Sequence, residues 1–177
     1  PLGSETERPH WIVLNDEGRI VETQPQIDGE TCPGSSWHGD WLSPRGVDLQ
    51  INGGLGLAFP ELSAADLPRL IALLELLWAD GVEAIAPTLV TCGIAPLRQA
   101  MAVLRQARLQ HQPGRCRLLG AHLEGPFLAE ARRGAHPIEH LAAPSLEALD
   151  HRIRGFESDI ALVTLAPELA GADVVIS

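Results

Sequence analysis

Short apolar runs alternate with longer segments whose apolar residues recur at helical spacing, from about residue 46 onwards. The short runs have the length and the Val, Ile and Leu content of buried strands, at residues 46–51, 81–88, 116–123 and 160–168. The longer segments predict amphipathic helices at residues 63–79, 96–111 and 145–156, with a further helical pattern from residue 169. Strands that alternate with helices in this way predict βαβ units and a parallel sheet.

Local signals place the ends of these helices. Ser63 and Asp66 have the spacing of a capping box, and Pro68 is tolerated best in a first turn, so the first long helix is predicted to begin near Asp66. Pro96 lies near the start of the second helix, and Gly114 follows its end.

The part before residue 46 has a different pattern. Residues 11–21 contain two β-like runs around a polar turn with a glycine, which predicts a hairpin. Residues 22–45 are rich in Gly, Pro, Ser and Thr, and we expect a loop there, anchored by Trp37 and Trp41. The opening "PLGS" (residues 1–4) is typical of the scar left when an expression tag is cleaved, and it is excluded from the fold.

The order of elements suggests an α/β fold of the (β/α)8 TIM-barrel type. Residues 46–177 would form roughly its first four βα units, and residues 5–45 would belong to a small β-sandwich subdomain. A doubly wound open sheet is the alternative. No Gly-x-Gly-x-x-Gly pattern follows the first strand, which argues against that alternative.

Composition and charge narrow the classes of partner. The chain of 177 residues has a formal net charge of −10, which disfavours nucleic acid and anionic lipid as partners. No apolar run approaches the roughly 18–20 residues that a membrane helix needs. The 3 cysteines form no Cys-x-x-Cys pair, and we interpret them as free thiols in a reducing cytoplasm.

Polar residues recur where each predicted strand ends, which is where parallel barrels place their functional groups. These residues are Gln50, Asn52, Thr88, Thr91, His122, Glu124, Thr164 and Glu168.

Glu124 is the strongest single candidate for chemistry among them. A carboxylate suits Zn²⁺, Mn²⁺ or Fe²⁺, but Glu124 could equally cap a turn or pair with Arg132 or Arg133. His122 alternates with Glu124 and so shares its face of the strand, either as a metal ligand or as a packed, orienting residue. His136 follows in a loop, where a solvated histidine is the ordinary expectation. The remaining histidines lack the spacing of metal ligands: His10, His38, His111, His140 and His151.

Four blocks in this order and spacing carry a resemblance: "GVDLQINGGLGLAF", "APTLVTCG", "GAHLEGPFL…RRGAHP" and "VTLAPE". Together they resemble the N-acetylglucosamine-6-phosphate deacetylases of the metal-dependent amidohydrolase superfamily. The resemblance implies a (β/α)8 barrel with one main divalent metal site, zinc in the first place and otherwise iron, manganese or cobalt. It implies hydrolysis of N-acetylglucosamine 6-phosphate to glucosamine 6-phosphate and acetate, in a cytoplasmic homodimer.

The resemblance also assigns roles to residues. It makes Glu124 of the "LEGP" motif a metal ligand, and Ala135 and His136 contacts to the sugar phosphate. Gln50 and Asn52 stand where many other amidohydrolases have a His-x-His metal pair, so both are expected to line the metal pocket, as is His122.

The chain departs from the family's pattern in one respect. Two metal-binding histidines and a catalytic aspartate of the family follow later strands, and residues 169–177 contain no replacement for them. We therefore expect the chain to correspond to the N-terminal half of such an enzyme and to be inactive by itself. The alternatives are another N-acyl amidohydrolase and a non-catalytic half-barrel that serves binding or assembly.

Overall fold

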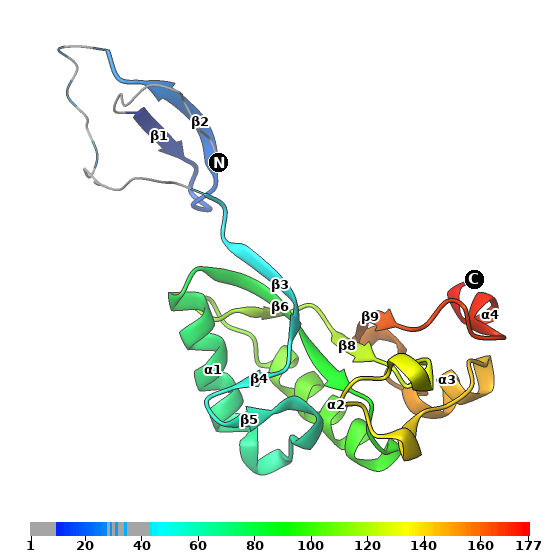
Figure 1. Cartoon of the computed structure of the whole chain (residues 1–177). Coiled ribbons are helices and arrows are strands. Elements are labelled where there is room, and N and C mark those ends of the chain that lie inside the picture. The colour runs from blue at the N-terminus through cyan, green and yellow to red at the C-terminus, as the bar shows by residue number, and fades with distance from the viewer. Residues whose placement is uncertain (1–9, 28, 30, 32–33, 35–42) are drawn as a thin grey trace. The chain divides into compact units, whose positions relative to one another are not determined.

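A computed structural model describes the chain except residues 1–9, 28, 30, 32–33 and 35–42 (Figure 1). It divides into two compact units, Pro1–Pro44 and Arg45–Ser177. In the first unit, β1 (His10–Leu14) and β2 (Ile20–Pro25) form an antiparallel hairpin, which confirms the predicted one. The expected anchors Trp37 and Trp41 lie outside the described residues.

The second unit is built on a parallel sheet, as predicted. Its main strands are β3 (Gly46–Ile51), β6 (Val82–Val90), β8 (Ala121–Glu124) and β9 (Ile160–Thr164), and they lie side by side in chain order. A short strand, β7 (Arg117–Leu118), also pairs with β6 in parallel. Figure 1 shows this order as a progression of colour across the sheet.

Helices follow the strands. The α-helices are α1 (Leu67–Ala79), α2 (Ile94–Leu109), α3 (Leu146–Ile153) and α4 (Ala172–Ile176). The shorter elements are β4 (Gly53–Gly54), β5 (Leu57–Ala58), η1 (Phe59–Glu61), η2 (Ala64–Asp66), η3 (Glu130–Arg132), η4 (Ile138–His140) and η5 (Glu157–Asp159).

The first long helix begins where its capping residues predict. Oδ2 of Asp66 accepts hydrogen bonds from the Ser63 backbone N–H at 3.0 Å and from the Ser63 hydroxyl at 2.7 Å. These two bonds fix the turn η2, and α1 continues from Leu67.

Several strands differ from their predicted extents. β2 continues to Pro25, although a loop is predicted from residue 22, and β9 ends at Thr164 instead of residue 168. The second predicted strand continues past Thr88 to Val90, because Pro87 pairs with Ile51 at an irregular point of the ladder where its missing N–H is tolerated. The third is split into β7 and β8 at Gly120, whose φ is +137°. A Cβ at Gly120 would lie 2.9 Å from the carbonyl oxygen of Asp159, so the backbones approach closely there.

Alternate residues of the sheet face opposite sides. Ile85, Leu89 and Leu123 point into the apolar core that the helices cover. On either side of the Leu89–Leu123 pair, Thr88 pairs with His122 and Val90 pairs with Glu124. Because side chains alternate along a strand, His122 and Glu124 share the face opposite the core, as the sequence predicts.

The sheet has two outer strands among the described residues, β3 and β9. Both expose apolar side chains: Val47 is 54% exposed, Leu49 50%, and Leu162 and Val163 37% each. Both outer strands therefore carry apolar side chains that are partly open to solvent.

A buried carboxylate ties α2 to the segment before β9. Asp159 is 9% exposed and accepts from Arg105 Nε at 2.8 Å and from Arg108 at 3.3 Å. The guanidinium of Arg105 also stacks on the ring of Phe156, 4.2 Å from its centroid. Charge, hydrogen bonding and stacking thus converge on one contact between α2 and η5.

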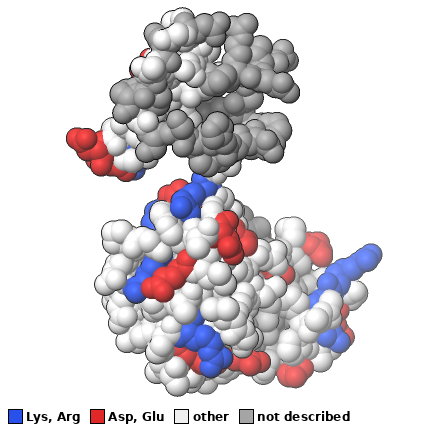
Figure 2. All heavy atoms as spheres, turned by 90° about the vertical axis from the view of Figure 1, so that its left-hand side faces the viewer, with Lys and Arg blue, Asp and Glu red and all other residues white. Residues whose placement is uncertain are grey.

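Charged side chains of both signs are interspersed on the face shown in Figure 2. In the second unit, ion pairs join Arg115 to Glu75 at 2.9 Å and Arg117 to Glu83 at 2.8 Å. Among the described residues, no helix is both long and apolar enough to cross a membrane.

Candidate functional site

A buried histidine connects three neighbouring strands on the polar face of the sheet. Nδ1 of His122 lies 3.0 Å from the Thr88 hydroxyl, and Nε2 lies 2.8 Å from the Thr164 hydroxyl. His122 is 5% exposed and Thr88 is fully buried, so solvent does not compete for the bond between them, whereas Thr164 is exposed. In a neutral imidazole one nitrogen donates and the other accepts, and a threonine hydroxyl can meet either need. His122 therefore orients the strand ends and leaves no ring nitrogen free for a metal.

Glu124 ends β8 with its side chain 23% exposed, and two predicted residues meet it there. The Gln50 side-chain amide donates to Oε2 at 3.4 Å. Nε2 of His136 lies 3.8 Å from Oε1. The end of β3, the end of β8 and the loop after β8 thus bring Gln50, Glu124 and His136 together, although the sequence separates them widely.

The alternative of an ion pair between Glu124 and a neighbouring arginine is not what the structure has. The guanidinium of Arg133 donates instead to the carbonyl of His136 at 2.5 Å and to that of Gly134 at 3.5 Å. No ion pair joins Glu124 to Arg132 in the described part of the chain. Arg133 closes its own loop and leaves the carboxylate of Glu124 open to other ligands.

Thr91 links β8 to the loop that carries His136, which is called the histidine loop below. Its position at a strand end in the sequence did not predict this role. Its hydroxyl donates to the carbonyl of Glu124 at 3.1 Å and lies 2.9 Å from Nδ1 of His136. Its backbone N–H donates to the same Nδ1 at 3.3 Å. Thr91 therefore contacts both the candidate ligand Glu124 and the candidate substrate residue His136.

Asn52 and Ala135 are less directly placed. The Asn52 carbonyl accepts from Phe59 N–H at 3.1 Å, which shapes the turn after β3. Ala135 is exposed in the loop beside His136. No described hydrogen bond connects either residue to Glu124.

The donor set at this site is incomplete for a metal. No group of three or more His, Cys, Asp and Glu side chains within the described residues is arranged to hold a metal ion. Glu124 offers a suitable carboxylate, but a catalytic zinc usually has about three protein ligands. Further ligands would have to come from outside the described residues.

The described cysteines do not supply these ligands. Cys92 and Cys116 are free, and burial raises the pKa of the Cys116 thiol to about 11. Burial also raises the pKa of Cys92, against a smaller opposing effect of Arg152. Neither cysteine belongs to a group of three or more potential ligands in the described part of the chain.

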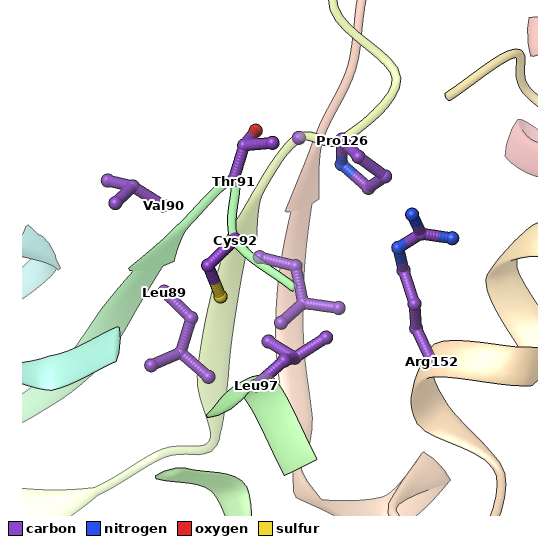
Figure 3. A pocket seen from close by; sticks show the side chains of 9 residues that line it. Leu89, Val90, Thr91, Cys92, Leu97, Pro126 and Arg152 are labelled. Carbon is purple, nitrogen blue, oxygen red and sulfur yellow. The ribbon is translucent and has the colours of Figure 1, made fainter. Parts of the chain in front are cut away.

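A small pocket lies beside the Thr91 contact (Figure 3). It is lined by Leu89, Cys92, Leu97, Pro126 and Arg152 among others, and its volume is about 10 Å³. Figure 3 shows the Thr91 hydroxyl turned away from the Cys92 sulfur. A space of this size holds roughly one water molecule, so it is not a sugar site.

A larger hollow of about 670 Å³ lies between α1 and the end of α2, where Leu67, Ile71 and Arg115 contribute to its lining. None of the predicted site residues lines it. The strand ends around Glu124 therefore remain the candidate functional site.

Comparisons with known proteins identify the relatives of the chain. No protein-family model matches the chain. It is 38% identical over 174 residues to the N-acetylglucosamine-6-phosphate deacetylase of Bos taurus, covering 94% of this chain and 41% of the relative. It is 35% identical over 142 residues to the enzyme of the same name from Caenorhabditis elegans, covering 76% and 33%. An N-acetylgalactosamine-6-phosphate deacetylase of Escherichia coli O157:H7 is 31% identical, covering 90% and 44%.

Solved structures similar to the chain are also deacetylases of this kind. The N-acetyl-D-glucosamine-6-phosphate deacetylase of Mycobacterium smegmatis matches with a TM-score of 0.74 at 28% identity, covering 96% of this chain and 42% of that one. The Thermotoga maritima N-acetylglucosamine-6-phosphate deacetylase matches with a TM-score of 0.68 at 26% identity, covering 93% and 40%. The chain thus spans less than half the length of these relatives. By sequence and by fold, it belongs to the N-acetylglucosamine-6-phosphate deacetylase family.

Proposed function

We propose that the intact protein hydrolyses the acetamide of N-acetylglucosamine 6-phosphate, releasing glucosamine 6-phosphate and acetate. The main observation in support is that Glu124, Gln50 and His136 cluster at one end of the parallel sheet. The chain is also related to deacetylases over most of its own length. We also propose that this reaction takes place in the cytoplasm, in a homodimer.

The proposed scaffold is a (β/α)8 barrel. The strand order β3-β6-β8-β9 follows the chain without reversal in the described part, whereas a doubly wound sheet reverses at its switch point. The apolar edges of β3 and β9 support further strands beside them. Residues 46–177 would supply about half of the barrel, and residues 5–45 part of a small β subdomain.

Each residue of the cluster has a proposed part. Glu124 binds a divalent metal, with zinc proposed first, and the amide of Gln50 holds its carboxylate in place. His136 and Ala135 contact the sugar phosphate, and Asn52 lines the pocket. His122 positions the ends of β6, β8 and β9. When bound, the metal would polarise the acetamide carbonyl and activate a water.

The assay is acetate release from the intact protein with N-acetylglucosamine 6-phosphate. N-acetylgalactosamine 6-phosphate and an N-acyl amino acid serve as comparison substrates. The first is chosen because one relative is named an N-acetylgalactosamine-6-phosphate deacetylase. We expect the highest kcat/KM with the glucosamine sugar. Turnover confined to the N-acyl amino acid would assign another amidohydrolase function.

The second candidate is a non-catalytic half-barrel for binding or assembly. The observation in its favour is that the described residues contain fewer ligands than a catalytic metal requires. Metal analysis of the intact protein separates the two: near-stoichiometric metal supports the hydrolase, and none supports the module.

A further inference from the structure

We propose that Thr91 is a positioning residue that holds His136 in the tautomer with its proton on Nε2, facing Glu124. The inference rests on the proposed function only in assigning His136 to the substrate. Its geometric basis is independent of the reaction. Two atoms of Thr91 lie at one ring nitrogen of His136: the hydroxyl oxygen at 2.9 Å and the backbone nitrogen at 3.3 Å from Nδ1.

The backbone N–H of Thr91 decides which nitrogen carries the proton. An amide N–H can only donate, so the nitrogen that it faces must present a lone pair. A proton on Nδ1 would set two donors against each other, and Thr91 is 5% exposed, so little water can separate them. Nδ1 is therefore the acceptor, and Nε2 carries the hydrogen in the neutral ring.

The hydroxyl of Thr91 adds a second constraint. With Nδ1 unprotonated, its single hydrogen is shared between two acceptors, Nδ1 of His136 at 2.9 Å and the carbonyl of Glu124 at 3.1 Å. It therefore joins the histidine loop to the end of β8. This contact holds the ring at a fixed position relative to the carboxylate.

Gly125 makes room for this hydroxyl. A Cβ on residue 125 would lie 2.1 Å from Oγ1 of Thr91, closer than any non-bonded contact allows, and the φ of Gly125 is +88°. A glycine directly after Glu124 thus allows Thr91 to reach both the carbonyl of Glu124 and His136. The space and the two hydrogen bonds point to the same role for Thr91.

The consequence concerns what His136 offers to a substrate. Its Nε2 lies 3.8 Å from Oε1 of Glu124, and its side chain is 14% exposed. A protonated Nε2 donates, so it recognises an oxygen of the substrate, such as a hydroxyl, carbonyl or phosphate oxygen. It cannot at the same time bind a metal through Nε2, which needs a lone pair there.

The first test reads the ring directly, by ¹⁵N NMR of the intact protein labelled at histidine, with His136→Asn used to assign the signal. We expect a pyridine-like Nδ1 and a pyrrole-like Nε2. In Thr91→Val, which replaces the hydroxyl by a methyl group, the Nδ1 resonance should move, and in Thr91→Ser it should stay close to that of the wild type. A pyrrole-like Nδ1, or an Nδ1 signal unaffected by Thr91→Val, would overturn the proposal.

The second test is a double-mutant cycle with Thr91→Val, His136→Asn and the combined variant. We expect Thr91→Val to lower kcat/KM about 3- to 10-fold, the range of one hydrogen bond, with unchanged metal content. In the His136→Asn background the same change should have almost no effect, because Thr91 acts through His136. Fully additive losses would show a general structural role and contradict the inference. If the intact protein releases no acetate, the proposed function fails, and the NMR experiment still decides the role of Thr91.

Discussion

The side-chain amide of Gln50 lies 3.4 Å from Oε2 of Glu124, although 74 positions separate the two residues in the chain. Gln50 ends β3 and Glu124 ends β8, and β6 lies between these strands. The bond therefore spans a whole strand and reaches Oε2 of the carboxylate, whereas Nε2 of His136 lies near Oε1. An amide in this position can steady a carboxylate without competing with it for a cation.

Replacing the carboxylate tests the metal assignment. We expect Glu124→Gln in the intact protein to lose most of its bound metal and to lower turnover by more than about 100-fold, beyond the usual effect of residues that only support a ligand. The change keeps shape and hydrogen bonding but removes the charge. Metal analysis and acetate release measure it. Glu130→Gln, an exposed change in η3, should leave both near the wild-type level. Equal metal content in the two variants would remove Glu124 from the metal site.

The threonines that flank His122 are expected to differ in their contribution to stability. Thr88 is fully buried, so Thr88→Val leaves Nδ1 of His122 without a partner, and we expect a loss of about 1–3 kcal/mol in the free energy of unfolding. Thr164 is exposed, so water can replace its hydroxyl in Thr164→Val, and the loss should stay below about 1 kcal/mol. Urea unfolding of both variants tests the order, and a larger loss for Thr164→Val would contradict it.

The buried carboxylate of Asp159 should contribute strongly to stability. Asp159→Asn leaves Arg105 and Arg108 without their charge partner, and we expect a loss of about 2–4 kcal/mol. The matched change is Asp150→Asn, which breaks a more exposed pair with Arg154 and should cost about 0–1 kcal/mol. Thermal or urea unfolding measures both, and equal losses would show that burial does not strengthen the Asp159 contact.

Asp66 predicts a dependence of stability on acid pH. Hydrogen bonds from the Ser63 side chain and backbone hold the pKa of Asp66 below its ordinary value. A lowered pKa in the folded state adds stability above the unfolded pKa of about 3.9, and this stability disappears as the pH falls through the folded value. We expect Asp66→Asn to flatten the loss of stability below about pH 4. Glu61→Gln serves as the control, and identical acid profiles for Asp66→Asn and the wild type would rule out the contribution.

The open edge of β3 predicts self-association of the purified chain of 177 residues. Val47 and Leu49 are about half exposed on this strand, which is an outer strand of the sheet among the described residues and can pair through its backbone and its apolar side chains. Light scattering should show assemblies that Val47→Thr with Leu49→Thr reduces. Leu109→Thr is the control, because Leu109 is 82% exposed but lies at the end of α2. A monodisperse monomer would contradict the prediction.

Much of the sheet could be predicted because its strands and helices have distinct apolar periods. The alternation of His122 with Glu124 also predicted correctly that they share a face. The end of β6 could not be predicted, because Pro87 usually marks the end of a strand and is tolerated here only through an irregular register with Ile51.

The contacts of Thr91 could not be predicted from the sequence, for a different reason. Thr91 and His136 are 45 positions apart, and their hydrogen bonds depend on how the loop after β8 folds back. No periodic pattern encodes that path. Gly125 was a signal in the sequence that a neighbouring group approaches the backbone closely, but a glycine before a proline ordinarily indicates only a turn.

The order β3-β6-β8-β9 has a consequence for how the chain acquires its structure during synthesis. Each of these four main strands pairs with the main strand made before it, so the sheet can grow at one margin as the polypeptide emerges from the ribosome. Parallel sheets usually form slowly because their pairings are remote in the chain, and this order keeps each pairing as local as a helical crossover permits. We therefore expect protection of the β3–β6 amides from hydrogen exchange to precede that of β9 in a nascent chain.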